Sequence, residues 1–305
     1  MDINGVDQIN PKKILSNAWF ALFLLALIFV GSQMGIGVLV HWFYPELAKT
    51  DWYPWALTGL SLIALGLPVY LLLMKRIPDS PRGEVVKLKF STFLVIFFIT
   101  SSAMYITNIL SSIITIAIAL LKGQTHLLNP AQEAILNSNF VVAFVYACII
   151  APLVEEFIFR KVLLNKLRRF GDKPAIIMTG IAFGLFHMNL SQFFYAAVLG
   201  FIFAYITIRT NTIKYSIILH MIINTMSTAV APFVIKGNVI VSLVMIIWQF
   251  AAILIGAVFL VLKFKHINLK KTEPIVKPED YLVNTGVICY LSICMVMIII
   301  ITVFY

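Results

Sequence analysis

The chain has 305 residues, of which 61% are hydrophobic and 12% are charged, and its mean hydropathy is +0.98. A soluble globular domain has about 45–50% apolar and about 25% charged residues, so this composition excludes one. The net charge of +10 comes from basic residues that lie between long apolar runs, which is typical of a membrane protein and not of one that binds nucleic acid. All three cysteines (Cys148, Cys289 and Cys294) lie inside apolar runs, so no disulfide framework is expected.

Apolar runs long enough to cross a roughly 30 Å hydrocarbon core predict an all-α fold, a polytopic transmembrane helix bundle of about eight or nine helices. The first run is longer than the roughly 7–15 apolar residues of a signal peptide, so we expect a retained helix. The fifth run is short and crosses the membrane only if its neighbours bury it. In chain order, the candidate spans are residues 18–40, 55–74, 91–121, 139–166, 174–188, 192–209, 213–234, 238–262 and 284–304.

Basic residues predict the orientation of these helices, because Lys and Arg are retained on the cytoplasmic side of a membrane. Of the 23 Lys and Arg residues, all except Lys49, Lys122 and Lys236 lie in the N-terminal segment or in every second connection and its flanks. We therefore expect a multi-pass protein of the cell membrane, with a cytoplasmic N-terminus and a C-terminus outside.

Ionisable and amide side chains inside the apolar runs are the candidate functional residues, because such groups are costly in a bilayer and usually functional. They cluster in three of the predicted spans, and this clustering is the main functional feature of the sequence. The fourth span contains Glu155, Glu156 and Arg160, the fifth contains His187, and the seventh contains His220 and Asn224.

Helical spacing separates the two carboxylates of the fourth span. Neighbouring residues point about 100° apart, whereas residues four apart share one face of a helix. Glu156 and Arg160 can therefore pair, in the favourable order of acid before base, and we interpret this pair as largely structural. Glu155 points elsewhere and is left free.

The same spacing groups Phe183 with His187 on the fifth helix and His220 with Asn224 on the seventh. Counted from the basic ends of their helices, Glu155, His187 and Asn224 lie at similar depths, roughly 20 Å along an untilted helix. We expect the four polar side chains to meet at one level within the membrane.

Such a group predicts hydrolytic chemistry. A carboxylate and an imidazole can hold and deprotonate a water, and a second imidazole with a carboxamide can donate hydrogen bonds to an oxyanion. A zinc ion held by Glu155, His187 and His220 is an alternative, because three such ligands plus water describe many catalytic zinc sites, although no His-Glu-x-x-His motif is present. Polar contacts that hold membrane helices together, or a transporter site, are further alternatives.

These residues resemble the motifs of the CPBP family, the CAAX proteases and bacteriocin-processing proteins that are also called the Abi family. The resemblance covers residues 139–234 and implies a chain of three parts: N-terminal helices in 1–138, a catalytic core of four helices in 139–234, and C-terminal helices in 235–305. The matching motifs are Glu155-Glu156-x-x-x-Arg160, Phe183-x-x-x-His187 and His220-x-x-x-Asn224, in the family's order and on three separate helices.

The resemblance implies an intramembrane endopeptidase that depends on a glutamate. In this interpretation Glu155 and His187 activate a water, and His220 and Asn224 form the oxyanion site.

Glu156, Arg160 and Phe183 would then have structural roles. The expected partners are the lipid bilayer and a membrane-associated peptide or protein substrate, and no cofactor is expected apart from the zinc alternative. The family also contains proteins tied to bacteriocin immunity and to protein partners. A non-catalytic immunity or scaffold protein with the same fold is therefore the alternative function.

Overall fold

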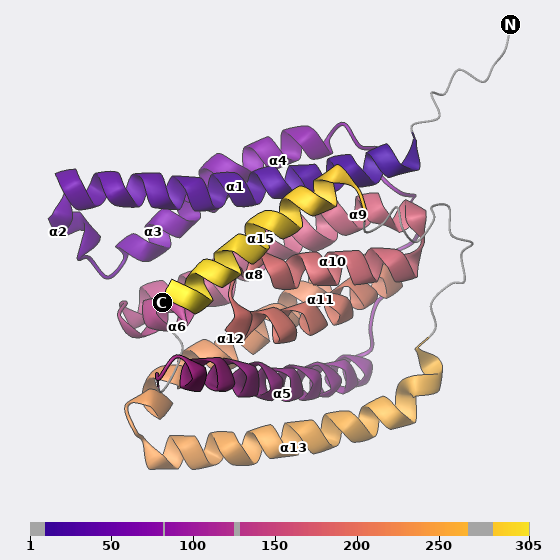
Figure 1. The fold of residues 1–305 in the computed structure, drawn as a ribbon. Coiled ribbons are helices and arrows are strands. Elements are labelled where there is room, and N and C mark those ends of the chain that lie inside the picture. Colours follow the sequence, from indigo (N-terminus) through magenta and orange to yellow (C-terminus); the bar gives the residue numbers. More distant parts are fainter. Residues whose placement is uncertain (1–9, 82, 125–128, 268–282, 305) are drawn as a thin grey trace, which may run out of the picture.

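The computed structural model describes residues 10–81, 83–124, 129–267 and 283–304, and every regular element in this part of the chain is a helix (Figure 1). Eight of these helices are long and apolar enough to cross a membrane. Those formed by a single element are α1 (Pro11–Phe43), α5 (Phe90–Leu121), α11 (Leu190–Thr210), α12 (Lys214–Ile235), α13 (Val239–Lys263) and α15 (Thr285–Phe304).

Two of the spans are composite. The span Tyr53–Met74 consists of α3 (Tyr53–Gly59), the π-helical segment η1 (Leu60–Gly66) and α4 (Leu67–Met74). The span Phe140–Phe170 consists of α7 (Phe140–Phe144), the π-helical η2 (Val145–Ile150), α8 (Ala151–Glu156), the π-helical η3 (Phe157–Leu163), α9 (Leu164–Leu167) and the 3₁₀ turn η4 (Arg168–Phe170). Short helices α2 (Pro45–Ala48), α6 (Pro130–Leu136) and η5 (Phe264–His266) lie in the connections.

The predicted all-α polytopic bundle is confirmed, and all nine predicted runs form helices. The fifth run is α10 (Asp172–Phe186), which has only 15 residues and is about 22 Å long. It forms a hairpin with α11, and small residues allow the two helices to approach. A Cβ at Gly200 would lie 2.7 Å from the Gly180 Cα, so the backbones touch at this point.

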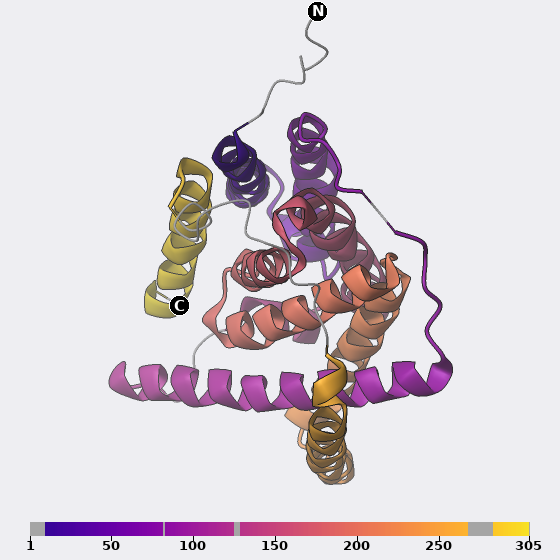
Figure 2. The ribbon, with the colours of Figure 1, turned by 90° about the vertical axis from the view of Figure 1, so that its right-hand side faces the viewer.

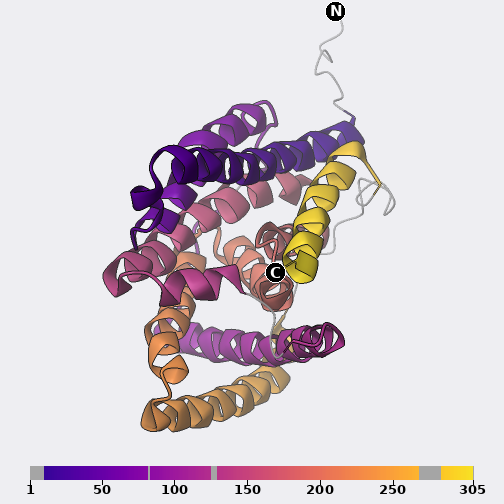
Figure 3. The ribbon, with the colours of Figure 1, turned by 60° about the vertical axis from the view of Figure 1, so that its left-hand side comes forward.

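The helices form three layers, and the middle layer contains the fourth span and the α10–α11 hairpin (Figures 1 and 3). On one side, α1 packs against α15 and against the composite helix of η1 and α4. On the other side, α5 packs against both α11 and α13. Figure 2 views α13 nearly end-on while α5 runs across the picture, so these two helices cross at a steep angle. The middle layer is therefore shielded by helices on both sides.

Two buried tyrosines fix the middle layer to its neighbours. The Tyr70 hydroxyl of α4 donates to the Ile158 carbonyl at 3.2 Å, and the Tyr290 hydroxyl of α15 donates to the Ala182 carbonyl at 2.7 Å. Both rings are fully buried. Because buried hydroxyls need a partner, these contacts set how the outer helices sit on the fourth span and on α10.

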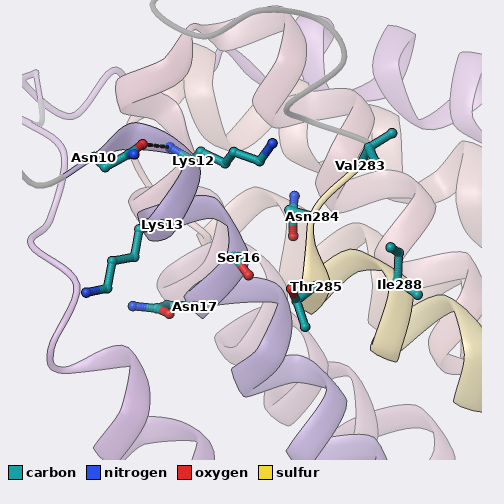
Figure 4. A pocket seen from close by; sticks show the side chains of 9 residues that line it. All are labelled: Asn10, Lys12, Lys13, Ser16, Asn17, Val283, Asn284, Thr285 and Ile288. Carbon is teal, nitrogen blue, oxygen red and sulfur yellow. Dashed lines mark hydrogen bonds between the residues drawn. The ribbon is translucent and has the colours of Figure 1, made fainter.

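Helices α1 and α15 begin at the same end of the bundle, which we call the N-terminal end. The Gly286 amide donates to Ser16 Oγ at 3.1 Å, and a Cβ at Gly286 would collide with the Ser16 carbonyl oxygen. Figure 4 shows a pocket of about 520 Å³ at this point, lined by residues from the starts of the two helices, including Lys12 and Lys13. None of the predicted site residues lines this pocket. The division of the chain into three parts stays a prediction.

Candidate active site

The two glutamates lie on α8, a short α-helical stretch between the π-helical segments η2 and η3. Pro152, at the start of α8, has no N–H and cannot bond the Cys148 carbonyl four residues earlier in the α-helical register. A π-helical segment accommodates such an interruption, and these segments are frequent at functional sites. The sequence interpretation treated this span as a regular helix, and Pro152 was the signal that could have indicated the change.

Glu156 and Arg160 form the predicted ion pair. Arg160 Nε lies 3.3 Å from Glu156 Oε2, and both side chains are completely buried. The guanidinium lies over the Phe183 ring at 4.3 Å and also contacts the rings of Phe159 and Phe203. Arg160 is thus held by one carboxylate and an aromatic cage, and the pairing predicted from the spacing is confirmed.

His220 of α12 lies between the two glutamates. Its Nδ1 is 3.1 Å from Glu156 Oε1, and its Nε2 is 3.6 Å from Glu155 Oε2. An ionised carboxylate only accepts hydrogen bonds, so Nδ1 is the donor toward Glu156. This finding corrects the expectation that Glu155 is left free: the side chain is 17% exposed and sits beside an imidazole nitrogen, just beyond hydrogen-bond distance.

His187 follows α10 directly, and one of its two ring nitrogens is available to accept a proton. Its Nδ1 lies 2.9 Å from the Phe183 carbonyl oxygen, and a carbonyl can only accept, so Nδ1 is the donor. In a neutral ring Nε2 then has a free lone pair, which suits a proton acceptor. The ring is half-buried and interacts electrostatically with Glu155. The next residue, Met188, has a φ of 50°, an uncommon backbone conformation for this side chain.

Phe183 joins the parts of this site. Its ring makes edge contacts with the His187 ring at 5.0 Å and with the His220 ring at 5.7 Å, and it lies under the Arg160 guanidinium. The structural role expected for Phe183 therefore has a physical basis: one buried ring sets the positions of both imidazoles. Phe203 of α11, which the sequence interpretation missed, packs on the other side of His220 at 5.3 Å.

Asn224 bonds the main chain of the fourth span. Its Nδ2 donates to the Ala147 carbonyl oxygen at 2.8 Å. Ala147 belongs to η2 and precedes Glu155 by eight residues, and the depth expected for the Asn224 side chain stays a prediction. A carboxamide has two N–H groups, and one remains for another acceptor. Nothing in the sequence indicated that the Ala147 carbonyl would be a partner.

The zinc alternative requires three ligands that converge. Among the described residues, which include Glu155, His187 and His220, no three His, Cys, Asp or Glu side chains form a group that could hold a metal ion. The expectation that the protein needs no metal stays a prediction, and elemental analysis of the purified protein can test it.

Comparison with known proteins points to the same part of the chain. Residues 137–226 match a family described as type II CAAX prenyl endopeptidase Rce1-like. A Bacillus subtilis (strain 168) protein named "Putative membrane peptidase YdiL" is 30% identical over 82 residues, which is 27% of this chain and 34% of the relative. The chain thus spans about a third of the length of the relative that it matches, and no solved structure matches it.

The matched segment contains the fourth span, the α10–α11 hairpin and most of α12, which are the elements that carry all seven predicted site residues. Through this segment, the chain is similar to the Rce1-like CAAX endopeptidases, and this similarity supports the resemblance to the CPBP family that the sequence motifs indicate.

Proposed function

We propose that this protein is an intramembrane endopeptidase that hydrolyses peptide bonds in a membrane-associated peptide or protein. The observation that carries the proposal is the assembly of two carboxylates and two imidazoles within the helix bundle, where Phe183 contacts both imidazoles. Ionisable groups in a membrane span are costly, and four of them in one cluster, with one cation beside them, indicate a functional site.

The first step would be activation of a water by Glu155 and His187. Glu155 is the glutamate that retains exposed surface, and His187 offers an unprotonated Nε2, so a water between them can lose its proton to one of these groups. The hydroxide attacks the peptide carbonyl carbon, the peptide C–N bond breaks, and the proton taken from the water passes to the leaving amine.

The negative charge on the carbonyl oxygen would be stabilised by His220 and Asn224. With Nδ1 donating to Glu156, His220 can donate from Nε2 only as an imidazolium, whose charge the two carboxylates compensate. Asn224 would offer the N–H that does not bond Ala147. Glu156 and Arg160 would hold His220 in place.

Comparative proteomics of membranes tests this proposal. Cells that express the wild type should contain peptide termini that disappear when Glu155→Gln replaces it at the same protein level. Glu46→Gln, a change to an exposed carboxylate on α2, is the matched control and should retain these termini. Identical termini in all three samples would instead support the non-catalytic immunity or scaffold protein.

A further inference from the structure

A second feature of the molecule is a cavity of about 640 Å³ next to the candidate active site. It lies between α5, α12 and α13, and it also touches α6 and the first turn of α11. Its volume falls in the range of about 300–1,000 Å³ that is usual for ligand pockets.

This cavity reaches one of the candidate catalytic residues. Asn224 lines it, one helical turn after His220. Tyr195 of α11 also lines it and interacts electrostatically with Glu155. A ligand in the cavity would therefore lie against the proposed oxyanion donor.

The cavity opens away from the N-terminal end of the bundle. Helices α5 and α13 are pressed together near Gly256, where a Cβ would collide with the Phe98 carbonyl oxygen, and Ser102 Oγ donates to the Ile253 carbonyl at 3.0 Å. The lining residues of α5 follow this crossing, those of α13 precede it, and those of α12 run from its middle toward its end. All of these segments belong to the end where α5 and α12 finish and α13 begins (Figure 1).

The connection between α4 and α5 lies at the N-terminal end, where its described residues are bonded to neighbouring helices. The Lys166 ammonium donates to the Ile77 carbonyl at 2.6 Å, and the Ser80 amide donates to the Asn165 carbonyl at 3.1 Å.

Further along the same connection, the Val86 amide donates to the Thr210 carbonyl at 2.9 Å. The Leu88 amide donates to the Tyr215 hydroxyl, also at 2.9 Å. These bonds tie the connection to α9, to the end of α11 and to the start of α12. The connection therefore forms a strap over the N-terminal end of the helices that carry the site.

Among the described residues that line the cavity, none is charged and more than half carry an amide or a hydroxyl group. Amide and hydroxyl groups can pair with the N–H and C=O groups of an extended peptide. A charged side chain in this cavity would find no counter-ion on the wall, and burying an unpaired charge is strongly unfavourable.

We propose that the cavity admits the substrate as an uncharged peptide segment, which enters from the end of the bundle opposite the strap. With the orientation predicted from the basic residues, that end faces the outside of the cell. This assignment rests on the proposed function, since it names the substrate class and entry side of the same site.

Cysteine labelling in cells tests the entry side. The parent carries Cys289→Ser, because Cys148 and Cys294 are buried while Cys289 is half-buried, and it should remain unlabelled by a membrane-impermeant sulfonated maleimide. Gln249→Cys places a thiol in the cavity, and Ile247→Cys is the matched control at the same depth of α13 outside it. Glu84→Cys reports on the strap.

Gln249→Cys should react in intact cells, Glu84→Cys only after permeabilisation, and Ile247→Cys in neither case. Reaction of Gln249→Cys only after permeabilisation, or no reaction at all, would overturn the proposed entry side.

Internally quenched peptides test the substrate class with the purified full-length protein in detergent. Peptides with uncharged polar residues around the cleaved bond should be hydrolysed at least tenfold faster than matched peptides with Lys or Glu there. Gln249→Glu should reduce this preference against the Lys peptides, whereas Gln249→Leu should not. Equal cleavage of charged and uncharged peptides would overturn the assignment. If the wild type cleaves no peptide while Gln249→Cys is labelled as expected, the proposed function and the substrate class fail, but the entry side stands.

Discussion

The buried ion pair of Glu156 and Arg160, which also contacts His220, leads to a quantitative prediction about the free energy of unfolding. Glu156→Ala removes the carboxylate that pairs with Arg160 and accepts from His220 Nδ1. All of these groups are buried, and the two guanidinium Nη atoms make no hydrogen bond within the described part of the chain. Breaking one side of a buried ion pair typically costs about 3–5 kcal/mol.

We therefore expect Glu156→Ala to lower the free energy of unfolding by about 3–5 kcal/mol, measured by titration with SDS in mixed micelles. The aromatic cage offsets part of the loss, because a desolvated cation over aromatic rings retains about 2 kcal/mol of attraction. Glu155→Gln is the matched control. It keeps the shape of a partly exposed side chain and should change the stability by less than about 1 kcal/mol.

A double variant separates the lost pair from a general packing defect. In Glu156→Ala/Arg160→Met the cation is removed as well, and an apolar side chain fills the cage of phenylalanines. Replacing a whole buried pair by apolar groups is often neutral, so only the lost bond to His220, about 1–2 kcal/mol, should remain. The reasoning is refuted if the double variant is no more stable than the single one. If Glu156→Ala is stable but inactive while Glu155→Gln stays active, the roles of the two carboxylates are reversed.

Three further predictions concern the chemistry. Glu155→Gln and His187→Ala should each lower peptidase activity by about 10²–10⁴-fold without loss of stability, because each removes a proton acceptor; the rate in purified protein and the unfolding titration check this together. Asn224→Ala should lower kcat by about 10²–10³-fold and also destabilise the protein by about 1–3 kcal/mol, because it leaves the Ala147 carbonyl without its donor. Active protein should contain less than one metal ion per chain by elemental analysis, and one tightly bound zinc that is required for turnover would favour the zinc alternative.

Much of the helical architecture could be predicted from the sequence, because long apolar runs are a direct consequence of membrane insertion. The pairing of Glu156 with Arg160 and of Phe183 with His187 followed from helical spacing alone. What the spacing does not determine is the rotation of one helix against another. For this reason the position of His220 between the two glutamates could not be predicted.

The hydrophobic pattern of the sequence also did not predict the local backbone geometry. The π-helical segments on both sides of α8 depend on how the fourth span packs, although each of η1 and η2 is followed by a proline, Pro68 and Pro152. The Asn224 side chain donates to a main-chain carbonyl of η2. The residue type does not reveal which main-chain carbonyl will accept such a bond. The strap and the cavity result from contacts between segments far apart in the chain.

The crossing of α15 gives the last prediction, and the structure shows independently of charge which helix ends share a side of the bundle. The bond between Gly286 and Ser16 places the start of α15 beside the start of α1, so these two helices begin on the same side of the bundle. Helix α15 has 20 residues and is about 30 Å long, enough to cross the hydrocarbon core. Reporter fusions after Lys263 and at the C-terminus should therefore report opposite sides, with Lys263 cytoplasmic because of the basic residues around it. Fusions after Thr50, in the first connection, should report the outside. The same side for Lys263 and the C-terminus would contradict the crossing of α15, and a cytoplasmic Thr50 would contradict the outward opening of the cavity.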